Sequence, residues 1–261
     1  MQILPVDKIQ IDFQKTIEIK KIVESTLRLI TFSRKHLADD LLNSYIEQTT
    51  SLKELVSIRN AQLEAETEEE IEIYANLLKV AMNFISEEIL ADICFNSEVQ
   101  LFQLFRLISP DSHAKHPNKY RTQDVQIGRY VCPDASEVPS RVSELFFSMN
   151  QISNPVIRAI YFHHELIRIH PFVDGNGRTT RMAKNWILLY ELYPPIFISK
   201  ENEKKTYVET LENSFLQLNQ KPNQWNSYLE LFFNQEIDRL LRSATEIHDK
   251  VTQIGKIRLK K

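Results

Sequence analysis

Apolar residues recur every three to four positions along most of this chain, which is the period of an amphipathic helix. Alternation of apolar and polar residues is confined to residues 124–132, where Gly128 near the centre predicts a short β-hairpin. We therefore expect a mainly α fold with one hairpin. The predicted helical segments are residues 17–62 in two parts, 98–108, 155–169, the residues from Thr179 onward, and 222–261 as a helix pair or one long helix. Pro110 is expected to end the helix over 98–108, and the polar residues 111–123 that follow predict turns and irregular structure.

Local signals fix two of the helix starts. Thr67 followed by Glu70 forms a capping box, and Asn154 before Pro155 combines a capping side chain with a proline suited to the first helical position. The acidic run from Glu64 to Glu72 lies at the first of these starts. Negative charge is favourable there, so we interpret the run as a solvated helix start and assign it no partner.

Composition narrows the class of protein. The chain has 261 residues, of which 43% are hydrophobic and 26% charged, with a net charge of −3, so it can bury a core and shows no global signal for nucleic acid or anionic membranes. Cys94 and Cys132 do not form a disulfide framework, and neither a signal peptide nor a membrane span is evident. We expect a cytoplasmic protein.

Two of the four glycines, Gly175 and Gly177, flank Asn176 between two segments of helical period. Glycine permits positive φ and close approach to the main chain. The stretch therefore predicts a helix, a tight loop and a second helix. The loop would offer backbone N–H groups and the positive end of the helix dipole to an anion.

Charged side chains around this loop indicate what the anion is. Arg178 and Arg181 lie three residues apart and share a helix face, which suits a polyphosphate better than a single carboxylate. Asp174 is placed to hold a Mg²⁺ ion that bridges phosphate oxygens. His170 can act as a base near neutral pH. Together these groups predict chemistry on a nucleotide phosphate.

Residues 170–181, His-Pro-Phe-Val-Asp-Gly-Asn-Gly-Arg-Thr-Thr-Arg, resemble the core motif of the Fic family, H-P-F-x-[D/E]-G-N-G-R-x-x-R, at every fixed position. The resemblance implies a Fic-fold helical bundle with a β-hairpin flap, and a core over residues 95–215. Residues 1–94 would form an N-terminal helical region and residues 216–261 a C-terminal extension. The implied activity is protein adenylylation (AMPylation), the transfer of AMP from ATP to a Ser, Thr or Tyr hydroxyl.

The resemblance also implies residue roles. His170 would be the base, Asp174 would hold Mg²⁺, and the Gly175–Gly177 backbone with the Asn176 side chain would stabilise the α-phosphate. Arg178 and Arg181 would hold the β- and γ-phosphates. The flap would align a segment of the target protein beside the site. Its residues are Val125, Gln126, Ile127 and Gly128, and self-modification and a homodimer are further expectations.

A second family pattern, the inhibitory [S/T]-x-x-x-E-[G/N], is similar to residues 43–48, Asn-Ser-Tyr-Ile-Glu-Gln. Asn43 and Gln48 depart from it, whereas Ser44, Ile46 and Glu47 keep the positions of its longer form. The resemblance implies that Glu47 pairs with Arg181 and occupies the donors that ATP needs.

Several alternatives stay open. The same site could remove AMP from a modified protein, could transfer UMP, phosphate or phosphocholine, or could belong to a silenced binding module. The complete motif argues against silencing. His163-His164-Glu165 suggests a metal site, but no second His follows at the zinc-protease spacing, so a structural role is favoured.

Overall fold

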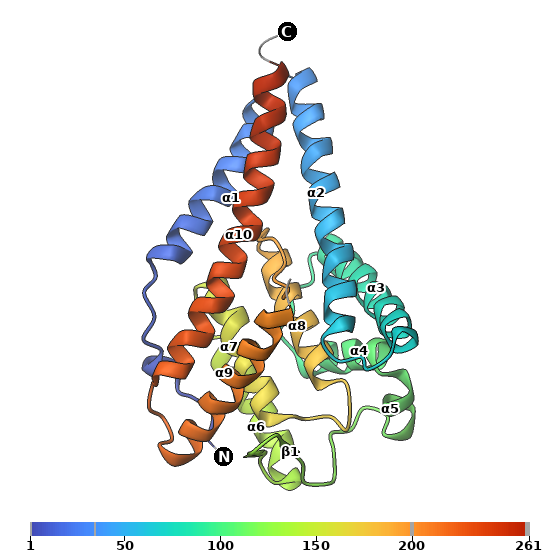
Figure 1. Ribbon diagram of the computed structural model, residues 1–261, viewed down its shortest axis with the longest axis vertical. Helices are drawn as coiled ribbons and strands as arrows, with labels where there is room; N and C mark the ends of the chain where they lie inside the picture. The colour runs from blue at the N-terminus through green and yellow to red at the C-terminus, as the bar shows by residue number, and fades with distance from the viewer. Residues whose placement is uncertain (1, 34, 199–200, 259–261) are drawn as a thin grey trace.

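The computed structural model describes residues 2–33, 35–198 and 201–258, and it confirms the mainly helical prediction (Figure 1). The predicted hairpin consists of β1 (Gln126–Ile127) and β2 (Tyr130–Val131), antiparallel with Ile127 opposite Tyr130. The helices are α1 (Gln14–Phe32), α2 (Lys35–Gln62), α3 (Glu68–Leu90), α4 (Glu98–Ile108), α5 (Pro110–Lys115), α6 (Val138–Met149), α7 (Pro155–Ile169), α8 (Asn176–Tyr190), α9 (Glu201–Gln220) and α10 (Ser227–Arg258). Short 3₁₀ turns cover Val6–Lys8 and Ala135–Glu137.

Helices α7 and α8 form the centre of the molecule and are joined by the loop that contains the motif. Every residue of α7 from Val156 to Ile169 except Arg158 is buried, because other elements surround the helix. The predicted cap is confirmed: the Asn154 Oδ1 accepts hydrogen bonds from the N–H groups of Val156 and Ile157. The chain order thus places the loop at one end of a buried helical hairpin.

Helix α4 covers the predicted residues 98–108, and a capping box between Ser97 and Gln100 begins it. The sequence predicted irregular structure after it, but α5 begins at Pro110. A proline at the first helical position loses no hydrogen bond, so Pro110 ends one helix and starts the next. A further boundary difference is at α8, which begins at Asn176 and therefore includes the second half of the motif.

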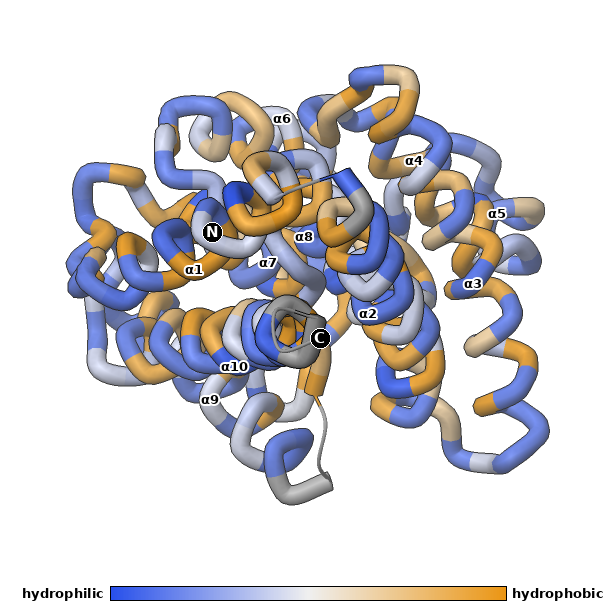
Figure 2. The backbone as a smooth tube through the Cα atoms, turned by 90° about the horizontal axis from the view of Figure 1, so that it is seen from above, coloured by the Kyte–Doolittle hydropathy of each residue, from blue (hydrophilic) through white to orange (hydrophobic). Residues whose placement is uncertain are grey.

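Helices α1, α2 and α10 rise from the core and converge at the top of Figure 1; we call these three helices the stalk. Figure 2 shows α2 and α10 nearly end-on around this convergence. The predicted C-terminal segment is one long helix, and its residues 259–261 lie outside the described ones. A small apolar cluster holds the stalk together, consisting of Leu41, Leu52, Ile247 and Val251.

The main core contains residues from all three predicted regions, including Leu4, Leu78, Phe162 and Leu240. The N-terminal segment is bound to α7 directly. The Leu4 N–H donates to Glu165 Oε2 (3.1 Å), and the Tyr161 hydroxyl donates to the Leu4 carbonyl (2.7 Å). Within the described residues, none of the helices combines the length and apolar character that crossing a membrane requires.

Candidate functional site

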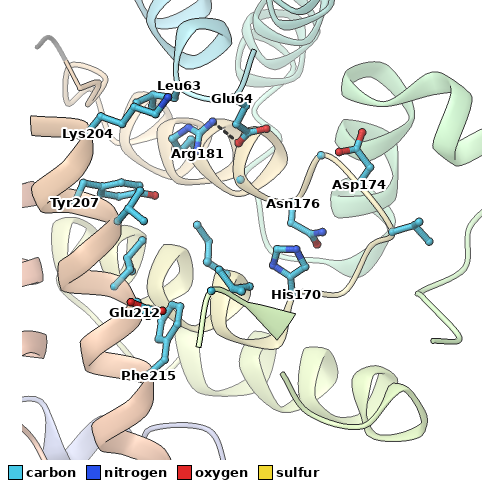
Figure 3. A pocket seen from close by; sticks show the side chains of 18 residues that line it. Leu63, Glu64, His170, Asp174, Asn176, Arg181, Lys204, Tyr207, Glu212 and Phe215 are labelled. Carbon is cyan, nitrogen blue, oxygen red and sulfur yellow. Dashed lines mark hydrogen bonds and ion pairs between the residues drawn. The ribbon is translucent and has the colours of Figure 1, made fainter. Parts of the chain in front are cut away.

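A cavity of about 550 Å³ opens where the α7–α8 loop meets the hairpin, α9 and the residues after α2 (Figure 3). This volume is in the range of small-molecule and cofactor sites. Polar groups of the motif line the cavity, namely His170, Asp174, Asn176 and Arg181. Apolar side chains also line it, namely Leu63, Ile127, Ile167, Val208, Leu211 and Phe215.

His170 ends α7 in the left-handed conformation (φ 53°), which turns the chain out of the helix and into the loop. Arg121 holds this turn. Its Nε donates to the His170 carbonyl and its backbone N–H donates to the Pro171 carbonyl, both at 2.8 Å. Burial lowers the pKa of the His170 imidazole to about 4, although the backbone at Ile167 and the charges of Glu64 and Asp174 act against it. The imidazole is therefore neutral near pH 7 and has a lone pair that can accept a proton.

The loop shape depends on Gly175 and Asn176. Gly175 has φ +73°, and a Cβ there would lie 2.0 Å from the Ser109 hydroxyl, so only glycine fits. The buried Asn176 side chain accepts from the Phe172 N–H and donates to the Phe172 carbonyl, both at 2.8 Å. These two contacts brace the loop, and the contact of this side chain with the α-phosphate stays a prediction.

The anion-binding part of the prediction concerns the start of α8. The first N–H groups of a helix have no partner within the helix, and here they belong to Asn176, Gly177 and Arg178. They lie at the positive end of the α8 dipole, beside two buried guanidinium groups. This arrangement favours a bound anion.

A carboxylate from the same chain, Glu64, already binds there. Glu64 Oε1 lies 2.7 Å from an Arg181 Nη, and Glu64 Oε2 lies 2.9 Å from Arg178 Nε. A Cβ on Gly177 would be only 2.1 Å from Glu64 Oε1, so the carboxylate rests on the start of α8. Burial disfavours the charge of Arg181, but the neighbouring Glu64 raises the pKa of Arg181 above its ordinary value.

The prediction that Glu47 pairs with Arg181 is therefore wrong. Glu47 is exposed in the stalk part of α2, and it precedes Glu64 by 17 residues (64 − 47). At about 1.5 Å per residue this separation is about 25 Å along the helix, beyond the reach of a side chain. The carboxylate that contacts both arginines comes from the end of the helix instead.

Sequence reasoning missed Glu64 because it is the first residue of the acidic run attributed to a helix start. A signal was nevertheless present. Asn60 and Glu64 have the same four-residue spacing as Asn43 and Glu47, so both pairs depart equally from the family's first position. Asn60 takes part in the contact, since its Oδ1 accepts from Arg181 Nε at 2.9 Å. Only the three-dimensional arrangement separates the two candidates.

Asp174 lies at the mouth of the cavity with 58% of its side chain exposed, and its Oδ2 accepts from Arg178 at 3.0 Å. One carboxylate plus phosphate oxygens is a common Mg²⁺ environment, so the residue fits the predicted metal role. No group of three or more His, Cys, Asp or Glu residues that could hold a metal occurs within the described residues. A Mg²⁺ ion here would therefore depend on the phosphates of a nucleotide.

Behind Arg181 lies a buried polar network. The Tyr207 hydroxyl and His163 Nε2 are 2.9 Å apart, and Tyr207 also lines the cavity. Burial lowers the pKa of His163 to about 3, so this ring is neutral. His164 is bound to Glu165 and Ser214, both at 2.8 Å. These contacts agree with the structural role expected for the His163-His164-Glu165 stretch.

The hairpin reaches the cavity with its turn. Ile127 and Gly128 line the cavity, whereas Gln126 is exposed outside it and Val125 packs against the core. The structure thus places two of the four predicted flap residues in the lining of the cavity that also contains His170.

Comparison with known proteins was made on sequence and on structure. The model of the Fic/DOC family matches residues 97–188. Protein adenylyltransferase Fic of Drosophila persimilis is 38% identical over 93 residues, which are 34% of this chain and 18% of that protein. The protein of the same name from Culex quinquefasciatus is 28% identical over 134 residues, or 50% of this chain and 27% of that protein. The chain thus matches about a quarter or less of these relatives' length.

The fold comparison covers more of the molecule. A Fic domain containing signaling protein from Bacteroides thetaiotaomicron superimposes with a TM-score of 0.70 over 92% of this chain and 98% of that chain, at 19% identity. Helical bundle, hairpin and motif loop define a Fic-type fold. Residues 97–188 of this chain match the Fic/DOC family, and the molecule shares the fold of the Fic domain containing protein.

Proposed function

We propose that this protein is a protein adenylyltransferase that transfers AMP from ATP to a hydroxyl group of a target protein. The observation that carries the proposal is the joint position of a neutral His170 and the arginine-flanked start of α8 on one cavity. The name shared by the curated relatives supports the same reaction. The apolar side chains that line the cavity would hold the nucleoside, and the start of α8 would hold the phosphates.

The reaction follows from these positions. The lone pair of His170 takes the proton of the target hydroxyl, and the hydroxyl oxygen forms a bond to the α-phosphorus of ATP. The bond between the α-phosphorus and the oxygen that bridges to the β-phosphorus breaks, and pyrophosphate leaves with that electron pair. Backbone N–H groups at Asn176 and Gly177 stabilise the charge on the α-phosphate, while Arg178 and Arg181 neutralise the leaving group.

Asp174 would hold Mg²⁺ at the mouth of the cavity, and the ion would supply charge neutralisation on the phosphate oxygens when bound. The Asp174 carboxylate also fixes the Arg178 guanidinium. The ring of Tyr74, whose centroid is 3.8 Å from the Arg178 Cζ, supports the opposite side of that group.

We further propose that Glu64 inhibits the resting protein in place of Glu47. Its carboxylate occupies both arginines and the start of α8, which are the groups that phosphates would use. Nucleotide and Glu64 therefore compete, and ATP binds productively only when the carboxylate leaves. The side chain is 28% exposed and lies just after the end of α2, so it can move without unfolding a helix.

Intact mass after incubation with ATP and Mg²⁺ tests both proposals. We expect Glu64→Gly to gain AMP units, the wild type to gain few, and Glu64→Gly combined with His170→Ala to gain none. Glu47→Gly is the matched control, and its labelling should equal that of the wild type. Labelling that survives His170→Ala would contradict the base assignment, and activation by Glu47→Gly rather than Glu64→Gly would contradict the inhibitory role.

Removal of AMP is a second candidate, because the Glu64 carboxylate lies in the cavity that also contains His170. A carboxylate there could orient a water molecule toward an AMP–protein bond. Wild-type protein should then release AMP from labelled Glu64→Gly protein, and Glu64→Gln should not. No release by the wild type would exclude this candidate.

A further inference from the structure

The turn of the hairpin is bound to α9 by Arg129 and Glu212. The Arg129 backbone N–H donates to Glu212 Oε1 at 2.6 Å, and its guanidinium donates to Glu212 Oε2 at 2.9 Å and to Oε1 at 3.3 Å. The same guanidinium also donates to Asn213 Oδ1 at 3.2 Å. One carboxylate therefore fixes both the main chain and the side chain of a single turn residue.

Gly128 shows how close this contact is. Its φ is +56°, the positive value that a two-residue hairpin turn needs at its first position. A Cβ there would lie 2.4 Å from Glu212 Oε1. The turn and the carboxylate fit together only because this residue has no side chain.

The second strand is anchored in the core next to this contact. The Tyr130 hydroxyl donates to the Arg168 carbonyl at 3.2 Å, and the Tyr130 ring lies 5.0 Å from the Phe215 ring of α9. Tyr130 is fully buried, whereas Arg129 has 68% of its side chain exposed and Glu212 only 18%. The second strand is thus anchored in the core by Tyr130, while the turn depends on the Arg129–Glu212 contact, which solvent can reach.

The Arg129–Glu212 contact lies where it can affect the cavity. Ile127, Gly128 and Glu212 line the cavity that contains His170 (Figure 3). A displaced turn would change the distance between the hairpin and His170. Any protein segment that presents a hydroxyl to His170 alongside the hairpin would be displaced with it.

We propose that Arg129 and Glu212 form a clasp that sets the hairpin at the distance from His170 that transfer to a protein hydroxyl requires. Arg129 is a positioning residue for the acceptor and does not contact the nucleotide phosphates. This inference rests on the proposed function. The alternative is that Arg129 and Glu212 form an ordinary surface ion pair, which contributes little to the stability of the fold and nothing to the transfer of AMP.

The test uses Glu64→Gly protein as the parent, with Arg129→Ala and Arg129→Lys added separately. Arg158→Ala is the matched control, because Arg158 pairs with Glu191 at 2.9 Å at the ends of α7 and α8 opposite the motif loop. Three quantities are measured: the initial rate of self-labelling with AMP, the dissociation constant of ATP, and hydrogen exchange of residues 125–132.

We expect Arg129→Ala to lower the labelling rate about tenfold, which corresponds to about 1.4 kcal/mol in the barrier. The dissociation constant of ATP should stay within about twofold, and exchange of the hairpin amides should rise. Arg129→Lys, which keeps the charge, should recover most of the rate, and Arg158→Ala should match the parent. A purely structural ion pair would not lower the labelling rate while leaving the dissociation constant of ATP unchanged.

Failures of the two proposals are distinguishable. An active parent whose labelling rate is unchanged by Arg129→Ala overturns the clasp alone. A fall in ATP affinity that accounts for the whole loss of rate also overturns it, because the residue would then act on the nucleotide. A parent that transfers no AMP overturns the proposed function, and the positioning role with it.

Discussion

At the residue scale, the proposed AMP transfer depends on keeping His170 neutral. The left-handed turn at the end of α7 places the ring in a buried environment, where Nδ1 has no hydrogen-bond partner. Burial penalises the imidazolium, so the pKa falls below its ordinary value near 6.5. Because the pKa is lowered, the neutral base is present throughout the neutral pH range and is lost only in acid.

The titration of His170 can be observed directly. We expect the NMR signals of its ring to stay constant from pH 8 to about 5.5, since an ordinary histidine changes over this range and a group with a pKa of about 4 does not. A midpoint near 6.5 for His170 would contradict the buried environment.

Asn176 offers a second prediction at this scale. Asn176→Ala removes both hydrogen bonds to the Phe172 backbone and leaves two buried backbone groups unpaired. We expect a loss of about 2 kcal/mol in the free energy of unfolding, measured by urea denaturation, together with weaker ATP binding. Asn150→Ala, a change at an exposed asparagine at the end of α6, should leave both quantities unaltered.

The sequence brought the motif residues together as one candidate site because they are close in the chain, while their roles stay predictions. Two glycines, an aspartate and two arginines within one loop are enough to indicate a phosphate site. Glu64 could not be chosen over Glu47 in this way. Its role depends on a contact between residues 114 and 117 positions apart, and no local pattern encodes that distance.

At the element scale, helix α7 carries the site, and its start is fixed by one side chain. Replacing Asn154 by Ala removes the acceptor for two N–H groups, those of Val156 and Ile157. We expect the melting temperature to fall by about 2–4 °C, equivalent to about 1 kcal/mol, as is typical for a lost helix cap. Serine at this position should restore most of the loss, and an unchanged temperature for Asn154→Ala would show that the cap is dispensable.

Helix existence was predictable where the apolar period is strong, as in α4 and α7. The short α5 was missed because Pro110 was taken as the end of a helix, whereas a proline both stops one helix and suits the first position of the next. The hairpin was found because Gly128 interrupts a strand pattern. Its attachment to α9 was not predictable, since Glu212 lies 83 residues from Arg129.

At the scale of the whole molecule, α10 is bound to the centre of the fold by buried charges. Glu236 is fully buried and accepts from Lys184 of α8 and from Arg239, each contact being very short. Burial alone would raise the pKa of Glu236, but Lys184, His163 and Arg239 lower it well below 4.5. The contribution of Glu236 to the free energy of unfolding is therefore present above about pH 4.5 and is lost as the pH falls further.

Two carboxylates on α10, two residues apart, allow a matched comparison. Glu236→Gln leaves the Lys184 charge buried without its partner, so we expect a loss of about 3–5 kcal/mol in the free energy of unfolding. Asp238→Asn removes an exposed partner of Lys15 on α1 and should cost less than about 1 kcal/mol. Equal losses in chemical denaturation would show that burial does not distinguish the two pairs.

The order of the chain gives the Glu64 contact a consequence during synthesis. Glu64 precedes Arg178 by 114 residues, so a ribosome completes the segment with the proposed inhibitory carboxylate before it reaches the motif. At about 5–20 residues per second, this lead is roughly 6–23 seconds. The Glu64 carboxylate is therefore always made first, and under the proposed inhibition each new molecule would close its own site as soon as the motif folds. Such an order would keep the proposed transfer activity blocked while the rest of the chain is still folding.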